Sequence, residues 1–92
     1  MIPHQITREQ LTQAAGIIDR NGIPGNRKST KYNVLVNGKK YPPKYLIAVA
    51  SKLALGKMIS ALIYNGGLES NSFLRDRGFS ITNKTGEVIT YP

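Results

Sequence analysis

The sequence predicts a small α+β domain in which a β-hairpin and two short C-terminal strands pack against three helices. Two patterns carry this prediction: apolar residues recur at helical spacing in several segments, and an Asn-Gly pair lies inside an alternating segment. A chain of 92 residues has the usual length of one domain. We therefore expect a single domain over residues 1–92, with its core in about residues 7–82.

The first helix is expected over residues 8–20. Thr7 and Gln10 have the spacing of a capping box, in which each side chain accepts a hydrogen bond from the backbone N–H of the other residue. The apolar residues that then recur at helical spacing are Leu11, Ala14, Ala15 and Ile18. An Asn-Gly pair follows and is a typical helix end. The polar residues 24–30 are rich in turn formers and predict a loop.

A β-hairpin is expected over residues 31–41. Asn37-Gly38 is its turn, because both positions of a type I′ turn require positive φ angles. Such a turn pairs Val36 with Lys39, Leu35 with Lys40 and Val34 with Tyr41. The strand face that we expect in the core then carries Tyr32, Val34, Val36 and Tyr41. Lys39 and Lys40 are expected to project into solvent at the tip.

The second helix is expected over residues 43–55 and the third over residues 69–77. Pro43 suits the first turn of a helix, where its missing N–H costs nothing. Apolar residues occupy most sides of the second helix, so it should be the central element of the core. Gly56 and Gly78 follow the two segments as C-terminal stops.

The rest of the chain has weaker patterns. Residues 57–64 are ambiguous, and a short helical turn is one option there. Residues 80–82 and 87–91 alternate weakly and predict two short strands. The expected order of elements is therefore α-β-β-α-α-β-β.

The charge of the chain points to a negatively charged partner. Thirteen Lys and Arg residues face five Asp and Glu residues, which gives a net charge of +8. No acidic residue occurs between Asp19 and Glu69. Such a one-sign block is typical of a protein that binds the phosphate backbone of nucleic acid. An acidic protein partner and a merely solubilising surface are the alternatives.

Several classes of protein are disfavoured by the composition. The chain has no cysteine, which excludes disulfides and thiolate zinc sites. No apolar run approaches the ~18 residues of a membrane span, and the N-terminus does not resemble a signal peptide. His4 is the single histidine, and the five acids are scattered. We therefore expect a cytoplasmic protein without membrane contact, cofactor, metal or catalytic residues.

The candidate DNA-binding residues fall into four groups. Arg27, Lys28, Ser29, Thr30 and Lys31 form a run of hydrogen-bond donors in the first loop, and Lys39 and Lys40 lie at the hairpin tip. Lys44 lies in the first turn of the second helix, where the helix dipole favours an anion, and Tyr45 follows it. Asn65, Gly66 and Gly67 precede the third helix. The plainer alternatives are a solvated loop, exposed turn lysines, core packing of the tyrosine and a helix-entry turn without a ligand.

Two segments resemble a known family. They are Tyr-Asn-Val-Leu-Val-Asn-Gly-Lys-Lys-Tyr-Pro-Pro-Lys-Tyr-Leu-Ile-Ala-Val-Ala, residues 32–50, and Tyr-Asn-Gly-Gly-Leu-Glu-Ser-Asn-Ser-Phe-Leu-Arg-Asp-Arg-Gly-Phe, residues 64–79. Their order and spacing resemble the N-terminal head domain of McrA-like HNH endonucleases, which restrict modified DNA. The chain departs from the pattern at Leu68, where an acid is common, and at Arg77, where an aliphatic residue is usual.

The resemblance implies a DNA-contacting accessory domain, with the nuclease site in a separate HNH domain that this chain lacks. It implies that Lys44, Gly66, Gly67, Ser70 and Asn71 lie near a functional surface, and Arg75 is a further candidate for selectivity. The hypothesis is therefore a non-catalytic module that binds duplex DNA, with a modified base as one option. A protein-interaction adaptor that docks a nuclease or an acidic partner, and an RNA-binding module, remain the alternatives.

Overall fold

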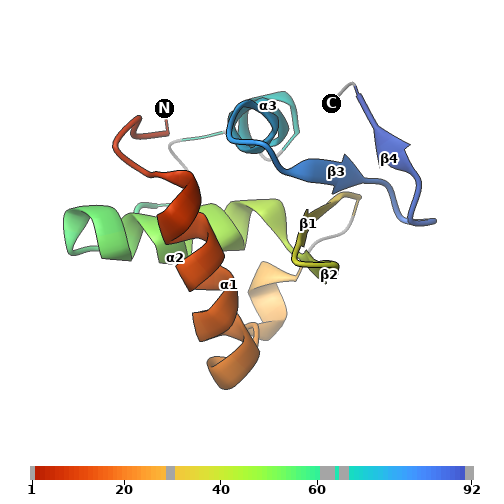
Figure 1. Ribbon diagram of the computed structural model, residues 1–92. Coiled ribbons are helices and arrows are strands. Elements are labelled where there is room, and N and C mark those ends of the chain that lie inside the picture. The colour runs from red at the N-terminus through yellow and green to blue at the C-terminus, as the bar shows by residue number, and fades with distance from the viewer. Residues whose placement is uncertain (1, 29–30, 61–63, 65–66, 91–92) are drawn as a thin grey trace.

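The computed structural model describes residues 2–28, 31–60, 64 and 67–90. Along the chain it has α1 (Arg8–Asn21), the 3₁₀ turn η1 (Gly25–Arg27), β1 (Asn33–Val36), β2 (Lys39–Tyr41), α2 (Pro43–Leu55), α3 (Leu68–Asp76), β3 (Ser80–Thr82) and β4 (Val88–Ile89) (Figure 1). The predicted α+β class and the predicted order of helices and strands are confirmed. The turn η1 lies in the segment for which the sequence predicts a loop.

The first helix begins where its capping box predicts. The Gln10 backbone N–H donates to the Thr7 hydroxyl at 3.1 Å, and the Thr7 N–H donates to the Gln10 side chain at 2.9 Å. The helix ends one residue later than predicted, at Asn21, and the N–H of Gly22 then bonds the Ile18 carbonyl at 2.7 Å. Gly22 has a φ of 80°, which favours glycine.

The hairpin has the predicted register. Val34 pairs with Tyr41, Leu35 with Lys40 and Val36 with Lys39. The turn residues Asn37 and Gly38 have φ angles of 52° and 80°, as a type I′ turn requires.

The C-terminal strands join the hairpin in one antiparallel sheet of order β2-β1-β3-β4. β3 pairs with β1, so that Asn33 lies opposite Thr82 and Leu35 lies opposite Ser80. β4 is Val88–Ile89, within the predicted residues 87–91, of which residue 91 lies outside the described residues. The sequence predicts these strands but not their partner, because the pairing joins segments that lie far apart in the chain.

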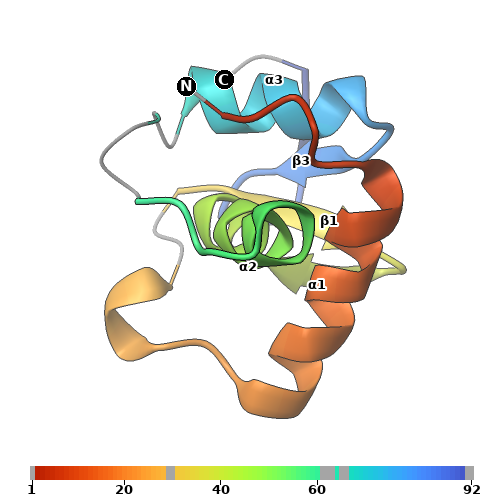
Figure 2. The same cartoon turned by 90° about the vertical axis from the view of Figure 1, so that its left-hand side faces the viewer.

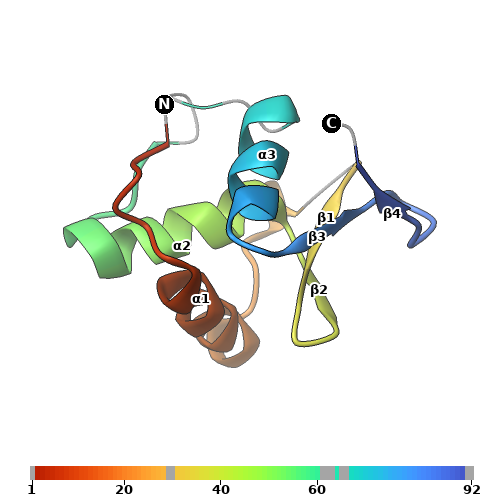
Figure 3. The ribbon, with the colours of Figure 1, turned by 45° about the horizontal axis from the view of Figure 1, so that its top comes forward.

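The strand register determines which segments of the chain lie together at each end of the sheet. The start of β1, the end of β2 and the end of β3 lie together, because Val34 pairs with Tyr41 and Asn33 with Thr82. The start of α2 and the β3–β4 turn follow directly from these strand ends. The hairpin tip lies at the opposite end, and Figure 3 shows it pointing away from the start of α2.

The second helix is the centre of the core, as predicted. Figure 2 looks along α2, with α1 beside it and α3 above it. It runs from Pro43 to Leu55 as predicted, and Gly56 ends it in the left-handed conformation. Its fully buried side chains include Leu46, Ile47 and Ala50. One cluster of buried residues joins α2 to both other helices and to the sheet.

The segment before α1 also contributes to the core. Ile2 and Ile6 are buried there. Arg77 fastens this segment, because its guanidinium donates to the Ile6 carbonyl at 2.8 Å and to the Phe73 carbonyl at 3.1 Å. These contacts give Arg77 a structural role.

The third helix is shifted by one residue from its predicted bounds of 69–77. It ends in a Schellman motif, because the Gly78 N–H bonds the Arg75 carbonyl at 2.9 Å and the Phe79 N–H bonds the Leu74 carbonyl at 3.1 Å. Before α3, residues 57–60 are not helical, and residues 61–63 of the ambiguous segment lie outside the described residues.

Candidate nucleic-acid interface

The thirteen basic residues differ in whether their side chains contact other groups of the same chain. Six have internal contacts: Arg8, Arg27, Lys39, Lys44, Arg75 and Arg77. The other seven are exposed and have no partner in the part of the chain that the structure describes: Arg20, Lys28, Lys31, Lys40, Lys52, Lys57 and Lys84. A cation without an internal partner keeps its charge available for an external anion.

Five of the predicted residues gather where α2 begins. We call them the basic end: Arg27, Lys28, Lys31, Lys40 and Lys44. Lys31 lies just before β1 and Lys44 in the first turn of α2, and the register brings these two segments to the same end of the sheet. The Lys40 side chain reaches this end from β2, because its Nζ lies 3.4 Å from the position that a Cβ on Gly86 would take.

Arg27 and Lys44 are held at the basic end by two tyrosines. The Arg27 guanidinium lies over the Tyr45 ring at 5.2 Å from its centroid, and the Lys44 ammonium lies over the Tyr64 ring at 5.0 Å. The Tyr64 hydroxyl donates to the Lys44 carbonyl at 2.6 Å. The Arg27 contact holds the loop before β1 against the start of α2, and the two Tyr64 contacts hold residue 64 against the same start of α2.

Tyr64 is a neutral part of this arrangement. Burial raises the pKa of Tyr64 to about 12, the nearby Arg27 opposes that shift, and the negative charge of Glu69 adds to it. The hydroxyl therefore keeps its proton near neutral pH, and the positive charges of Arg27 and Lys44 are not offset by a phenolate. Because Tyr64 is buried, it packs in the core and offers no open ring to a base.

Lys39 lies apart from the basic end. Its ammonium pairs with the Asp19 carboxylate of α1 at 3.4 Å, and the same carboxylate accepts a hydrogen bond of 2.8 Å from the Tyr41 hydroxyl. Adjacent strand residues point to opposite faces, so Lys39 turns toward α1 while Lys40 turns away from it. The two tip lysines, which the sequence grouped together, therefore have different surroundings.

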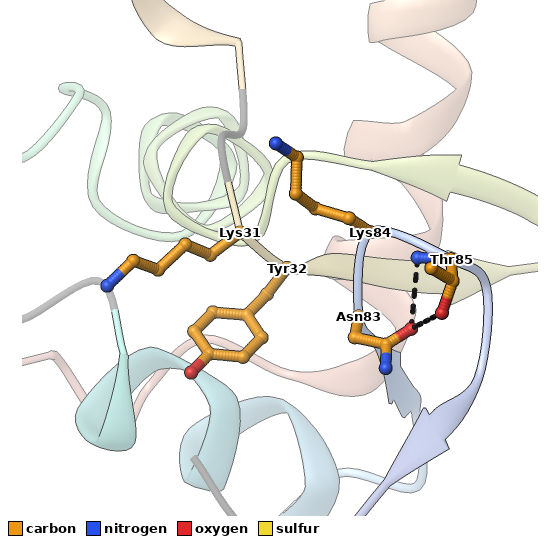
Figure 4. A pocket seen from close by; sticks show the side chains of 5 residues that line it. All are labelled: Lys31, Tyr32, Asn83, Lys84 and Thr85. Carbon is orange, nitrogen blue, oxygen red and sulfur yellow. Dashed lines mark hydrogen bonds between the residues drawn. The ribbon is translucent and has the colours of Figure 1, made fainter.

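A cleft lies beside the basic end, between the start of β1 and the β3–β4 turn (Figure 4). It has a volume of about 320 Å³ and is lined by Lys31, Tyr32, Asn83, Lys84 and Thr85. Sequence reasoning missed Lys84, because this residue lies beyond Glu69 and outside the acid-free stretch. The signal that marks it is its place in an Asn-Lys-Thr-Gly turn, which the register brings back to β1.

A family model, described as the ScoMcrA-like N-terminal head domain, matches residues 4–83. The chain belongs to this family. The match confirms the resemblance that the two sequence motifs indicated, and it includes all of the basic end. No curated protein and no solved structure matched the chain.

The predicted residues Asn65, Gly66 and Gly67 lie before or at the start of α3 in this head domain. Asn65 and Gly66, like Ser29 and Thr30 of the first loop, lie outside the described residues. Gly67 is the N-cap of α3 and supplies no side-chain cap.

Three further residues of α3 are less accessible than the family resemblance implied. The side chains of Ser70 and Asn71 are fully buried, with 0% exposure, so they lie inside the head domain rather than at its surface. Arg75 donates to the Ile89 carbonyl at 3.2 Å and so ties α3 to β4. These three residues do not belong to the basic end.

Two further features of the described residues concern metal binding and membrane-spanning helices. Among the described residues, no group of three or more His, Cys, Asp or Glu side chains is placed to hold a metal ion. Over the same part of the head domain, every helix is too short or too polar to cross a membrane.

Proposed function

We propose that this head domain is a non-catalytic DNA-binding module of a modification-dependent restriction endonuclease. The basic end binds duplex DNA by contacting phosphates. The observation that carries the proposal is that Lys28, Lys31 and Lys40 have no partner among the described residues and lie beside Arg27 and Lys44 at one end of the sheet.

The chemistry of the basic end suits a phosphate backbone. Its cations come from three segments that the fold holds in place: the first loop, β2 and the start of α2. Such contacts position a protein on DNA, and the counterions that they release from the phosphates contribute to the binding affinity. They do not read bases, so any selectivity for a modified base needs further contacts in the head domain or in the protein to which it belongs.

The family supports the proposal that binding and cleavage of DNA belong to different domains. An N-terminal head domain of McrA-like proteins is a non-catalytic module. We place the nuclease chemistry in a separate HNH domain and give the head domain the task of holding the enzyme on DNA.

The test compares two double variants that lose the same charge. Lys28→Ala/Lys40→Ala removes two cations of the basic end, and Lys52→Ala/Lys57→Ala removes two exposed cations from the opposite end of α2. We expect the first pair to weaken binding to a labelled duplex about tenfold in fluorescence anisotropy at about 50 mM salt. We expect the second pair to bind nearly as the wild type does. Equal losses in both variants would contradict the proposal.

A second function, docking of a protein partner, is favoured by a different part of the surface. Leu53, Leu55 and Met58 are exposed apolar side chains near the C-terminal end of α2. Exposed large apolar side chains near one another in the chain are a feature of some protein-contact surfaces. If this end docks the nuclease or another protein, Leu53→Ser/Met58→Ser will abolish that contact in a pull-down with the partner and leave DNA binding intact.

A further inference from the structure

We propose that the cleft beside the basic end is a second contact for the same nucleic-acid strand. One strand crosses the Tyr32 side chain, and Lys31 and Lys84 contact different phosphates of its backbone. This inference rests on the proposed DNA binding and adds a site on the β3–β4 turn that the sequence did not predict.

The first support is the rigidity of the turn that carries Lys84. The Asn83 side-chain oxygen accepts three hydrogen bonds, from the Thr85 N–H at 3.1 Å, the Thr85 hydroxyl at 2.8 Å and the Glu87 N–H at 2.9 Å. The Asn83 N–H also bonds the Glu87 carbonyl at 2.9 Å. A lysine on a fixed turn loses less conformational entropy on binding than one on a loose loop.

The second support is that the neighbouring acidic side chain, Glu87, is hydrogen-bonded within the turn and does not pair with Lys84. The Glu87 carboxylate accepts hydrogen bonds from the Asn83 amide at 3.1 Å and from the Thr85 hydroxyl at 3.0 Å. These bonds lower the pKa of Glu87, so it remains a carboxylate that belongs to the turn. Within the described residues, Lys84 has no ion pair or hydrogen bond, and its positive charge faces solvent.

The third support is the shape of the cleft. Tyr32 is partly exposed and packs against the core, so it lines the cleft as a fixed surface. Figure 4 shows the Lys31 and Lys84 side chains extending in different directions from two separate segments. Two separated cations that line one cleft with an aromatic ring suit consecutive backbone groups of a strand better than a single small anion.

Lys40 makes the turn more positive. Its Nζ lies close to Gly86, one turn position beyond Thr85. Three cations therefore lie at the β3–β4 turn: Lys40 from β2, Lys31 from the start of β1, and Lys84 of the turn itself. The cleft extends the basic end toward β4, and the Glu87 carboxylate of this turn is held by Asn83 and Thr85.

The experiment measures the salt dependence of binding for three single variants of the full chain. We expect Lys84→Ala to reduce the slope of log K against log salt by about one and to weaken binding roughly threefold to fivefold at low salt. Asn83→Ala removes no charge but loosens the turn, and we expect it to weaken binding about twofold. Lys57→Ala is the matched control, and its slope should equal that of the wild type. Circular dichroism checks that each variant is folded.

The outcomes separate the two proposals. If Lys28→Ala/Lys40→Ala loses DNA affinity but Lys84→Ala has the slope of Lys57→Ala, the basic end stands and the cleft is not a contact. If the wild type does not bind DNA, both proposals fail. If Lys84→Ala impairs binding of a polyglutamate peptide but not of DNA, the cleft serves an acidic protein and this inference is overturned. An unchanged affinity in Asn83→Ala would refute the role of the turn in positioning Lys84.

Discussion

At the scale of single residues, Gly78 shows how a local signal and a distant contact coincide. The sequence marks it as the stop of α3, and its φ of 89° confirms the left-handed conformation. The structure adds that a Cβ at this position would lie 2.8 Å from Nη1 of Arg8, whose guanidinium stacks on Phe79. The local sequence pattern predicts the left-handed conformation of Gly78. It does not predict the contact with Arg8, because that contact depends on how α1 packs.

Gly78→Ala is therefore expected to destabilise the head domain by about 1–2 kcal/mol. The left-handed backbone disfavours a side chain, and Arg8 must move away from its place. Urea unfolding of the variant and the wild type measures the difference. Gly25→Ala is the control, because Gly25 has no positive φ and nothing lies within 4 Å of the position that its Cβ would take. Equal stabilities of the two variants would show that Gly78 is not constrained.

Lys39, Lys40, Ser70 and Asn71 show the limit of residue-level prediction. The sequence places both lysines in solvent, and both are exposed. It has no means to assign Asp19 as the partner of one and the β3–β4 turn as the neighbour of the other. The burial of Ser70 and Asn71 likewise depends on how α3 packs, which a motif does not reveal.

At the scale of elements, the bounds follow from strong local signals. Pro43 and Gly56 delimit α2, and Asn37-Gly38 sets the hairpin register, so both elements are predictable residue by residue. The pairing of β3 with β1 is not predictable, because a three-residue strand carries too little pattern to select a partner. The contact between the hairpin and α1 is another such long-range feature, and it is made by Tyr41 and Asp19.

The Tyr41 contact predicts a dependence of stability on alkaline pH. Burial, the hydrogen bond to Asp19 and the charge of Asp19 raise the pKa of Tyr41 to about 12 from its ordinary 10.0. Below pH 10 both the folded and the unfolded state keep the proton, so this contribution is fully present. As the pH rises toward 12, the unfolded state loses the proton first, and the folded state is destabilised.

Urea unfolding at about pH 9 and about pH 11 tests this dependence. We expect the wild type to lose about 1 kcal/mol more than Tyr41→Phe between the two conditions, because the variant has no phenol at this position. Lysine titration affects both proteins and cancels in the comparison. Parallel losses in the two proteins would contradict the role of Tyr41.

At the scale of the whole molecule, the sequence predicts the charge but not its arrangement. The acid-free stretch between Asp19 and Glu69 contains the basic end, and it also contains Lys39, Lys52 and Lys57, which lie elsewhere. Lys84 lies outside the stretch but returns to the basic end through the sheet register. A charge count along the chain thus indicates a negatively charged partner, and only the fold separates the cations that share a surface.

The salt dependence of DNA binding by the wild-type head domain tests the central claim most directly. The basic end and Lys84 together offer six cations: Arg27, Lys28, Lys31, Lys40, Lys44 and Lys84. If all six contact phosphates, log K against log salt has a slope of about −5, and affinity for a duplex falls about a thousandfold between about 50 and about 200 mM salt. Fluorescence anisotropy with a labelled duplex measures this fall. Affinity that is independent of salt, or no binding at low salt, would contradict the account.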